Sequence, residues 1–321
     1  MLRQICDLSS EYYFLVPKEG CEFEKLPPID EERSLDQEKK RLKTFSEFEI
    51  SKSIILGAML RKSEIHPLDY VFSSLGCKIQ FMDEKCEEAK LIMRYMYHSN
   101  GAKDLRVEGI FRVENEPDGN KFKQTSKPRN RKLLWHGTKL SNMMSILSRG
   151  MIVDAPYTEI TGRFYGNGLY FADIFDKSYK YMDGLDRQGQ YMLLCDVALG
   201  KSNQVVGSVL RGPKNRFLKL NEAKKAADEN KSLHVLGNHV PDDTMTLKTH
   251  HGYSIPVGKI VSRKKKDDHR YIPDYSEYIV YNASNVVLRY IVKIGDGSKK
   301  YDLNEYLMET DESVATNDKF S

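Results

Sequence analysis

The feature that most constrains the fold is a series of short apolar runs, bounded by glycine, asparagine or charged residues, over the last two thirds of the chain. QYMLLCDVALG at 190–200 is typical of a buried strand, and LRVEGIFRV at 105–113 alternates as half-buried strands do. Further strands are expected at KLLWHG, LYFAD, EYIVYN and NVVLRYIVKI. The last two, separated only by ASN, predict a β-hairpin.

Helical spacing is expected at four places between and before these strands. Residues 36–60 carry apolar side chains at helical intervals, namely Leu42, Phe45, Phe48, Ile54, Ile55 and Met59. A second helix is predicted to begin at Asp83 as N-cap, and a short third helix to run from Ser141 as N-cap to Gly150 as C-cap. A fourth covers IFDKSYKYM at 174–182. Many strands and few helices favour an α+β domain behind a small helical segment.

Composition excludes some classes of protein and leaves others open. The chain has 321 residues, with 50 Lys and Arg against 46 Asp and Glu, a balance too mild to indicate a nucleic-acid or membrane partner. Its five cysteines are widely spaced without a CxxC pair, which predicts neither a zinc site nor a disulfide framework and favours a reducing compartment. No run approaches the roughly 20 apolar residues of a membrane span. No strand–GxGxxG–helix unit supports a dinucleotide-binding Rossmann fold.

His136 is a candidate for chemistry because its titratable ring ends an apolar strand. Tyr170 lies within another apolar strand, and Glu277 opens a third. A histidine or tyrosine at such a place is often only a core residue, and 19 tyrosines leave many for packing. Glu277 is harder to assign to packing, because an unpaired buried carboxylate is costly.

Three stretches occur in a fixed order: LLWHGT, then GNGLYFAD followed by DKSYKY, then SEYIVYN. Together they resemble the catalytic domain of the poly(ADP-ribose) polymerases, most closely the DNA-break-stimulated nuclear branch, from about residue 5 to about 295. The resemblance implies an ADP-ribosyltransferase fold of two small packed β-sheets with flanking helices. It also implies a partial helical regulatory domain at 1–62, a catalytic domain at 63–300 and a polar tail at 301–321 that we expect to be disordered.

The resemblance assigns the family's triad to His136, Tyr170 and Glu277. It implies that His136 hydrogen-bonds the ribose on the adenosine side of NAD+, and that Gly137 lets the backbone approach the nicotinamide carboxamide. The other NAD+-binding residues that it implies are Thr138, Asn142, Arg163, Tyr170, Lys177, Ser178 and Tyr181. In this set Ser178 bonds the carboxamide through its hydroxyl, and Tyr170 and Tyr181 stack on the two faces of the nicotinamide ring.

Glu277 is the residue on which the implied chemistry depends. Cleavage of the nicotinamide–ribose bond develops positive charge on the sugar, and a carboxylate near the 2′-hydroxyl stabilises it. The same carboxylate can polarise an incoming hydroxyl, as polymer elongation requires. Lys177 would hold Glu277 or the acceptor.

The implied activity is transfer of ADP-ribose from NAD+ to protein acceptors, including the chain itself, and then to the growing polymer. NAD+ is here a consumed substrate, and neither a cofactor nor a metal is expected. Two alternatives stay open: a mono-ADP-ribosyltransferase with the same triad, and a catalytically silent scaffold that binds NAD+ or ADP-ribose. The acceptor loop around 240–270 would decide the first, and the complete triad argues against the second.

Two departures from the family pattern affect regulation and binding. The helical domain is expected to be truncated, so DNA breaks would be sensed through missing or separate regions. Ile152 stands where relatives usually have an arginine, and Arg163 would supply that contact instead. The resemblance implies a nuclear location, with the cytoplasm as the alternative, and no membrane partner.

Overall fold

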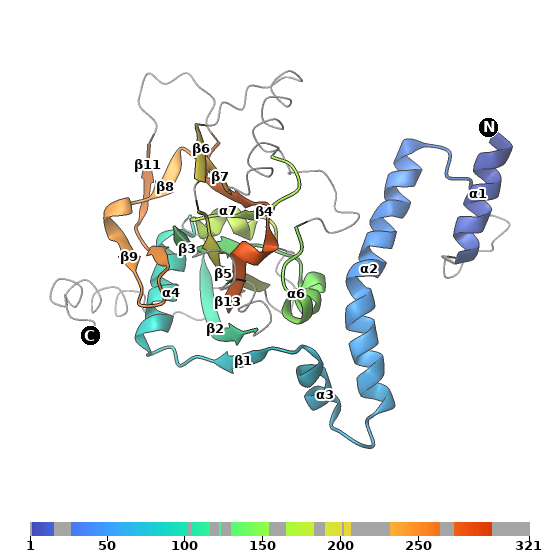
Figure 1. Cartoon of the computed structure of the whole chain (residues 1–321), viewed down its shortest axis with the longest axis horizontal. Coiled ribbons are helices and arrows are strands. Elements are labelled where there is room, and N and C mark those ends of the chain that lie inside the picture. Colours follow the sequence, from blue (N-terminus) through green and yellow to red (C-terminus); the bar gives the residue numbers. More distant parts are fainter. Residues whose placement is uncertain are drawn as a thin grey trace.

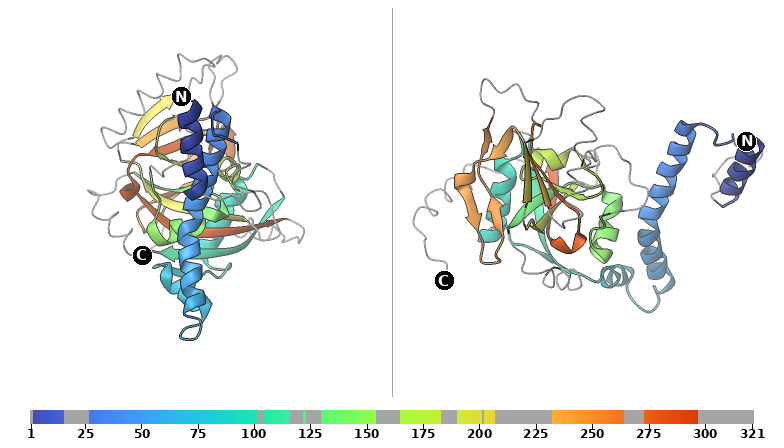
Figure 2. Two further views of the ribbon diagram at one scale, coloured as in Figure 1. Left: turned by 90° about the vertical axis from the view of Figure 1, so that its right-hand side faces the viewer. Right: turned by 45° about the horizontal axis from the view of Figure 1, so that its top comes forward.

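The computed structural model of the chain describes residues 2–15, 27–101, 104–115, 122, 130–153, 165–182, 190–200, 202–206, 232–263 and 273–296. Within these ranges the strands form three sheets, and the α+β class is confirmed. The sheets and most short helices gather in one body, while α1 and α2 stand to one side of it (Figure 1 and Figure 2). The tail at 301–321 lies outside the described residues.

The largest sheet has seven strands in the order β1-β2-β13-β5-β3-β10-β9. Their bounds are β1 Lys78–Phe81, β2 Leu105–Glu114, β13 Val286–Asp296, β5 Gln190–Ala198, β3 Arg131–His136, β10 Ser254–Pro256 and β9 Thr246–Lys248. Neighbours are antiparallel except β3 and β10, which are parallel. Two central strands, β5 and β13, are apolar runs that the sequence marks as strands.

A four-stranded sheet has the order β4-β12-β7-β6, and a two-stranded ribbon pairs β11 with β8. Their bounds are β4 Leu169–Phe171, β12 Glu277–Val280, β7 Ser232–Leu236, β6 Ser202–Val206, β11 Ile260–Ser262 and β8 His239–Pro241. An isolated bridge joins the two larger sheets, because Trp135 and Ala172 exchange backbone hydrogen bonds of 2.8 and 3.0 Å. This bridge brings the end of β3 beside the end of β4.

The helices cover the faces and edges of these sheets. Their bounds are α1 Leu2–Leu15, α2 Glu32–Leu60, α3 Pro67–Ser74, α4 Glu87–His98, α6 Met143–Arg149 and α7 Phe175–Tyr179, with short 3₁₀ turns η2 Leu140–Asn142, η3 Asp243–Met245 and η4 Ala283–Asn285. α1 is tied to α2 by the Tyr12 hydroxyl, which donates to Glu38 at 3.0 Å. The buried Ile54 of α2 belongs to the same apolar cluster as Met143 and Leu147 of α6.

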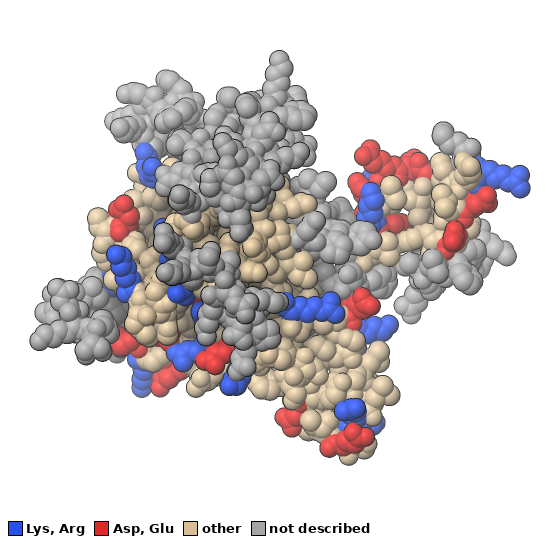
Figure 3. Space-filling view, in the orientation of Figure 1, with Lys and Arg blue, Asp and Glu red and all other residues tan. Residues whose placement is uncertain are grey.

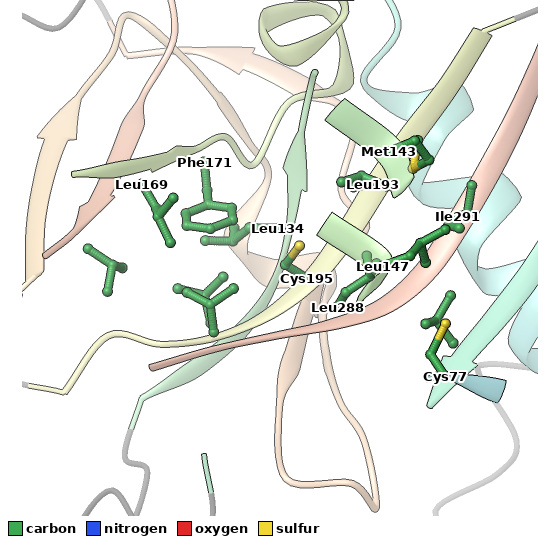
Figure 4. Close-up of a cluster of buried hydrophobic side chains, with 14 of the residues drawn as sticks. Cys77, Leu134, Met143, Leu147, Leu169, Phe171, Leu193, Cys195, Leu288 and Ile291 are labelled. Carbon is green, nitrogen blue, oxygen red and sulfur yellow. The ribbon is translucent and has the colours of Figure 1, made fainter. Parts of the chain in front are cut away.

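Alternation along the strands builds one core on each face of the seven-stranded sheet. On one face Leu133 and Trp135 pack with Tyr95 of α4. On the other face Leu134, Leu193 and Cys195 lie against Phe171 of the four-stranded sheet, with α6 beside them (Figure 4). Successive residues of β3 thus serve opposite cores, which leaves His136 on the side of the four-stranded sheet.

Three local predictions are wrong. EYIVYN and NVVLRYIVKI do not form a hairpin, because β12 lies in the four-stranded sheet and β13 in the seven-stranded one. The N-cap of α4 is Cys86, whose sulfur accepts from the Ala89 amide at 3.4 Å, while Asp83 closes the preceding turn. Ser141 lies inside η2, and the N-cap of α6 is Asn142, one residue later than predicted. Gly150 does end α6, at φ +78°.

Candidate active site

His136 lies at the end of β3, with its ring directed towards β4. Its Nδ1 is 2.8 Å from the backbone oxygen of Tyr170. Because a carbonyl only accepts, Nδ1 carries the proton, and in the neutral ring Nε2 is left as an acceptor. Burial lowers the pKa of His136, and the bond to the Tyr170 carbonyl opposes that shift only in part. The ring is therefore neutral at pH 7, and its Nε2 can accept a hydrogen bond.

Tyr170 is held through both its backbone and its side chain. Its backbone carbonyl accepts from His136, and its hydroxyl donates to the carbonyl of Gly166 at 2.9 Å. The same hydroxyl accepts from the amide of Tyr165 at 3.0 Å. β4 is antiparallel to β12, and Tyr170 is paired with Ile279.

Gly137 lies where β3 passes α7, and the approach leaves no room for a side chain. A Cβ at this position would lie 1.9 Å from the carbonyl oxygen of Ser178. The Ser178 hydroxyl in turn donates to the carbonyl of Trp135 at 3.1 Å, from a buried position. These contacts set the spacing between the strand end and α7.

Trp135 explains why this strand end is rigid. The side chain is fully buried, and its ring centroid lies 4.8 Å from that of Tyr95 and 5.3 Å from that of Phe175. Its backbone meets Ala172 in the bridge between the sheets. The residue before His136 is thus anchored through both its side chain and its backbone, as a rigid site requires.

Glu277 begins β12 and is buried beside Lys177 of α7. The Lys177 ammonium lies 2.5 Å from Oε1 of Glu277, while Oε2 has no hydrogen-bond partner among the described residues. Burial alone would lower the pKa of Lys177, but the charge and hydrogen bond of Glu277 outweigh it and the pKa is raised. The pair therefore presents a carboxylate held through Oε1, whose buried Oε2 has no donor among the described residues.

For the other predicted NAD+-binding residues the structure shows fewer contacts. The Asn142 amide donates to the Thr138 hydroxyl at 3.1 Å, so these two residues hold each other after β3. Tyr181 is about half exposed, with the Lys177 ammonium 5.6 Å from its ring centroid. Arg163 lies outside the described residues.

A polar group that sequence reasoning did not single out lies behind Glu277. The Tyr278 hydroxyl donates to Oδ2 of the buried Asp173 at 2.9 Å, and its ring stacks on His234 at 4.1 Å between centroids. The Lys132 ammonium lies 5.6 Å from the same ring. The signal in the sequence was the aspartate that closes the apolar stretch LYFAD, a costly place for an unpaired carboxylate.

Charge and metal ligands add little to this site. In the described ranges, no group of three or more His, Cys, Asp or Glu side chains could hold a metal ion. Lysine and arginine are interspersed with aspartate and glutamate over the described parts of the face shown in Figure 3. A search of the described helices also finds none of the length and apolar character needed to cross a membrane.

Comparison with known proteins places this arrangement in a family. Residues 86–295 match the model of the poly(ADP-ribose) polymerase catalytic domain, and residues 1–72 match that of the poly(ADP-ribose) polymerase regulatory domain. Poly [ADP-ribose] polymerase 1 of Gallus gallus is 32% identical over 299 residues, which are 91% of this chain and 28% of that protein.

Further relatives give the same result. Poly [ADP-ribose] polymerase 1 of Danio rerio is 31% identical over 296 residues, covering 90% of this chain and 27% of that protein. Poly [ADP-ribose] polymerase tankyrase of Caenorhabditis elegans is 29% identical over 290 residues, covering 89% of this chain and 12% of that protein. The chain thus spans less than a third of the length of these relatives. Its match to the catalytic-domain model extends over more than half of its residues, and the chain belongs to the poly(ADP-ribose) polymerase family.

Proposed function

We propose that this chain is an NAD+-dependent poly(ADP-ribose) polymerase. It would transfer ADP-ribose from NAD+ to protein acceptors, its own side chains included, and then to the growing polymer, with release of nicotinamide. The observation that supports this most directly is the buried Glu277 carboxylate, held by Lys177 at 2.5 Å on a strand paired with the one that carries Tyr170. No redox cofactor or metal enters the proposal, since NAD+ is cleaved.

In this proposal His136, Tyr170 and Glu277 are the catalytic residues. Nε2 of the neutral His136 ring accepts from a hydroxyl of the ribose on the adenosine side. Tyr170 and Tyr181 receive the nicotinamide ring between them, and the backbone of Gly137 with the Ser178 hydroxyl fixes its carboxamide. The close passage of Gly137 to the backbone of Ser178 supports this, because it brings these two residues side by side.

Glu277 acts on the sugar. Its free oxygen accepts from the 2′-hydroxyl and stabilises the positive charge that develops as the nicotinamide–ribose bond breaks. For elongation, the same carboxylate polarises the attacking hydroxyl of the polymer end. Lys177 holds the carboxylate in place through the ion pair, while Thr138, Asn142 and Arg163 complete the binding of NAD+.

The domain bounds, the recognition of DNA breaks and the location of the protein belong to the same proposal. We place the regulatory segment at 1–62 and the catalytic domain at 63–300. Recognition of DNA breaks, where it occurs, would come from regions other than these. A nuclear location agrees with that function, and the cytoplasm is the alternative.

The test is a transfer assay with labelled NAD+, with and without nicked DNA, resolved on a denaturing gel. The wild type is expected to give a high-molecular-weight ladder. Glu277→Gln should abolish the ladder while the dissociation constant for NAD+ stays within a few-fold of the wild type. Glu87→Gln makes the same chemical change on the exposed side of α4 and is the matched control. A single sharp band would indicate mono-transfer, and NAD+ binding without any label would indicate a scaffold.

A further inference from the structure

Two consecutive residues of β12 are tied to one short segment of chain, each from the opposite face of the strand. Glu277 forms its ion pair with Lys177, and Tyr278 donates to Asp173 at 2.9 Å. Asp173 and Lys177 are four residues apart, Asp173 just after β4 and Lys177 within α7. Because neighbouring side chains of a strand point to opposite faces, the two contacts clamp β12 against this segment from both sides.

The second tie lies in a dry and crowded place. Asp173 is 4% exposed and Tyr278 is 2% exposed. Oδ1 of Asp173 has no hydrogen-bond partner among the described residues, and Oδ2 accepts from Tyr278, which ties the carboxylate to β12. Hydrogen bonds to an ionised group in such a medium are short and strong.

The Tyr278 ring is itself fixed by its neighbours. It stacks on His234 of β7 with a 17° angle between the ring planes, and the Lys132 ammonium of β3 lies over it. Val235, next to His234, pairs with Glu277 across the sheet. A movement of the Tyr278 ring would therefore displace the backbone of both β7 and β12 at the point where β12 begins with Glu277.

We propose that Asp173 and Tyr278 are positioning residues that hold Glu277 in register with Lys177 for ADP-ribosyl transfer. The proposal rests on the proposed function, because it concerns how the same carboxylate is aimed. Neither residue needs to touch NAD+, and their loss should reduce kcat while leaving the KM for NAD+ nearly unchanged. A misplacement of about 1 Å at a catalytic group is enough to slow a reaction by up to about a hundredfold.

The pair should also leave a mark on the pH dependence. Burial raises the pKa of Asp173 to about 6, against the opposing effects of the Tyr278 hydroxyl and the Lys132 charge. Tyr95 of α4 faces the same carboxylate, and His234 and Arg263 lie around Tyr278. Asp173 is thus ionised at pH 7 and becomes neutral below about 6. The Asp173 carboxylate then loses the charge that strengthens its hydrogen bond from Tyr278, and kcat should fall as the pH drops through about 6.

The experiment compares four variants with the wild type in steady-state kinetics between pH 5 and 8: Tyr278→Phe, Asp173→Asn, their combination, and Tyr253→Phe. Tyr253 is the matched control, because it is 3% exposed and loses one buried hydroxyl, bonded to Tyr290 at 3.0 Å in the other sheet. Each single variant of the pair should lower kcat at pH 7.5 about tenfold with KM within twofold. The component of the pH profile near 6 should vanish in both.

The combination should be no worse than the poorer single variant, since both remove the same contact. Wild-type kcat in Tyr278→Phe and Asp173→Asn, or losses that multiply in the combination, would overturn the proposal. So would a loss confined to KM, or an equal loss in Tyr253→Phe. Should Asp173→Asn fail to fold, Tyr278→Phe decides alone, because it keeps the ring and its packing. An inactive wild type would refute the proposed function instead.

Discussion

The substitution Gly137→Ala tests whether the site depends on the close passage of β3 and α7. The added methyl would lie 1.9 Å from the Ser178 carbonyl oxygen and 2.8 Å from its carbon. Real Cβ atoms essentially never approach a neighbouring heavy atom more closely than 3.0 Å, so one backbone must move by at least about 1 Å. No flexible side chain can yield here, because the obstructing atoms belong to the backbone of α7.

The magnitude follows from what α7 carries. A shift of about 1 Å displaces Ser178 and Lys177 together relative to His136, and such a misplacement can cost about a hundredfold in rate. Forcing one extra methyl into a packed place costs about 1–3 kcal/mol of stability. We therefore expect kcat/KM for NAD+ to fall by about 100-fold, together with a lowered Tm.

The assay pairs steady-state kinetics and NAD+ titration calorimetry with thermal melts. Gly76→Ala is the control. Gly76 has φ +64°, and no atom lies within 4 Å of the added Cβ. The substitution therefore strains the backbone by about 1–2 kcal/mol without a steric clash. It should lower Tm without lowering kcat/KM. Near-wild-type kcat/KM in Gly137→Ala, or equal losses in both variants, would refute the argument from this contact.

Three further substitutions test separate contacts. Lys177→Met leaves the buried Glu277 without its cation, so it should lower stability by about 3 kcal/mol and abolish transfer; gel assays and urea unfolding check both, and Lys177→Arg should restore part of each. Burial lowers the pKa of His136 in the folded chain below its unfolded value of 6.5. The stability that the neutral ring contributes is therefore complete above pH 6.5 and is lost as the pH falls through the folded pKa. Below pH 6.5 the free energy of unfolding should therefore fall more steeply in the wild type than in His136→Gln, and equal slopes would contradict it. Cys86→Ser replaces a long sulfur cap of 3.4 Å by a hydroxyl and should raise stability by about 1 kcal/mol in a thermal melt; a lower Tm would argue against capping by Cys86.

The strands with a clear pattern could be predicted from the sequence. The motifs LLWHGT, GNGLYFAD and SEYIVYN indicate the candidate site residues. β2 and β5 fall where alternation and an apolar run indicate them, because their side chains pack on faces that local periodicity encodes. The helix caps could not be predicted as well. Asp83 and Cys86 both precede the same apolar face, and tertiary packing decides which of them begins the helix. The functional roles of His136, Tyr170 and Glu277 stay predictions.

The contact between Asp173 and Tyr278 could not be predicted from the sequence, for a different reason. The two residues are 105 positions apart, and each alone is compatible with ordinary packing. Only the association of β4 with β12 brings them together, and that association is set by the order of strands in a sheet. A sequence pattern reports which face a side chain occupies, but it does not report which strand lies opposite.

The hairpin that does not form shows how much depends on this point. Asn282 accepts from the amide of Ser284 at 2.9 Å and starts η4, so the link between β12 and β13 is a 3₁₀ turn and not a two-residue hairpin turn. β13 then enters the seven-stranded sheet between β2 and β5, while β12 pairs with β4 and β7. Had the two strands paired with each other, Glu277 would have opened a strand in the larger sheet, away from Tyr170. The departure of β12 into the other sheet is therefore the step that puts the carboxylate across from the strand bearing Tyr170 and within reach of Lys177.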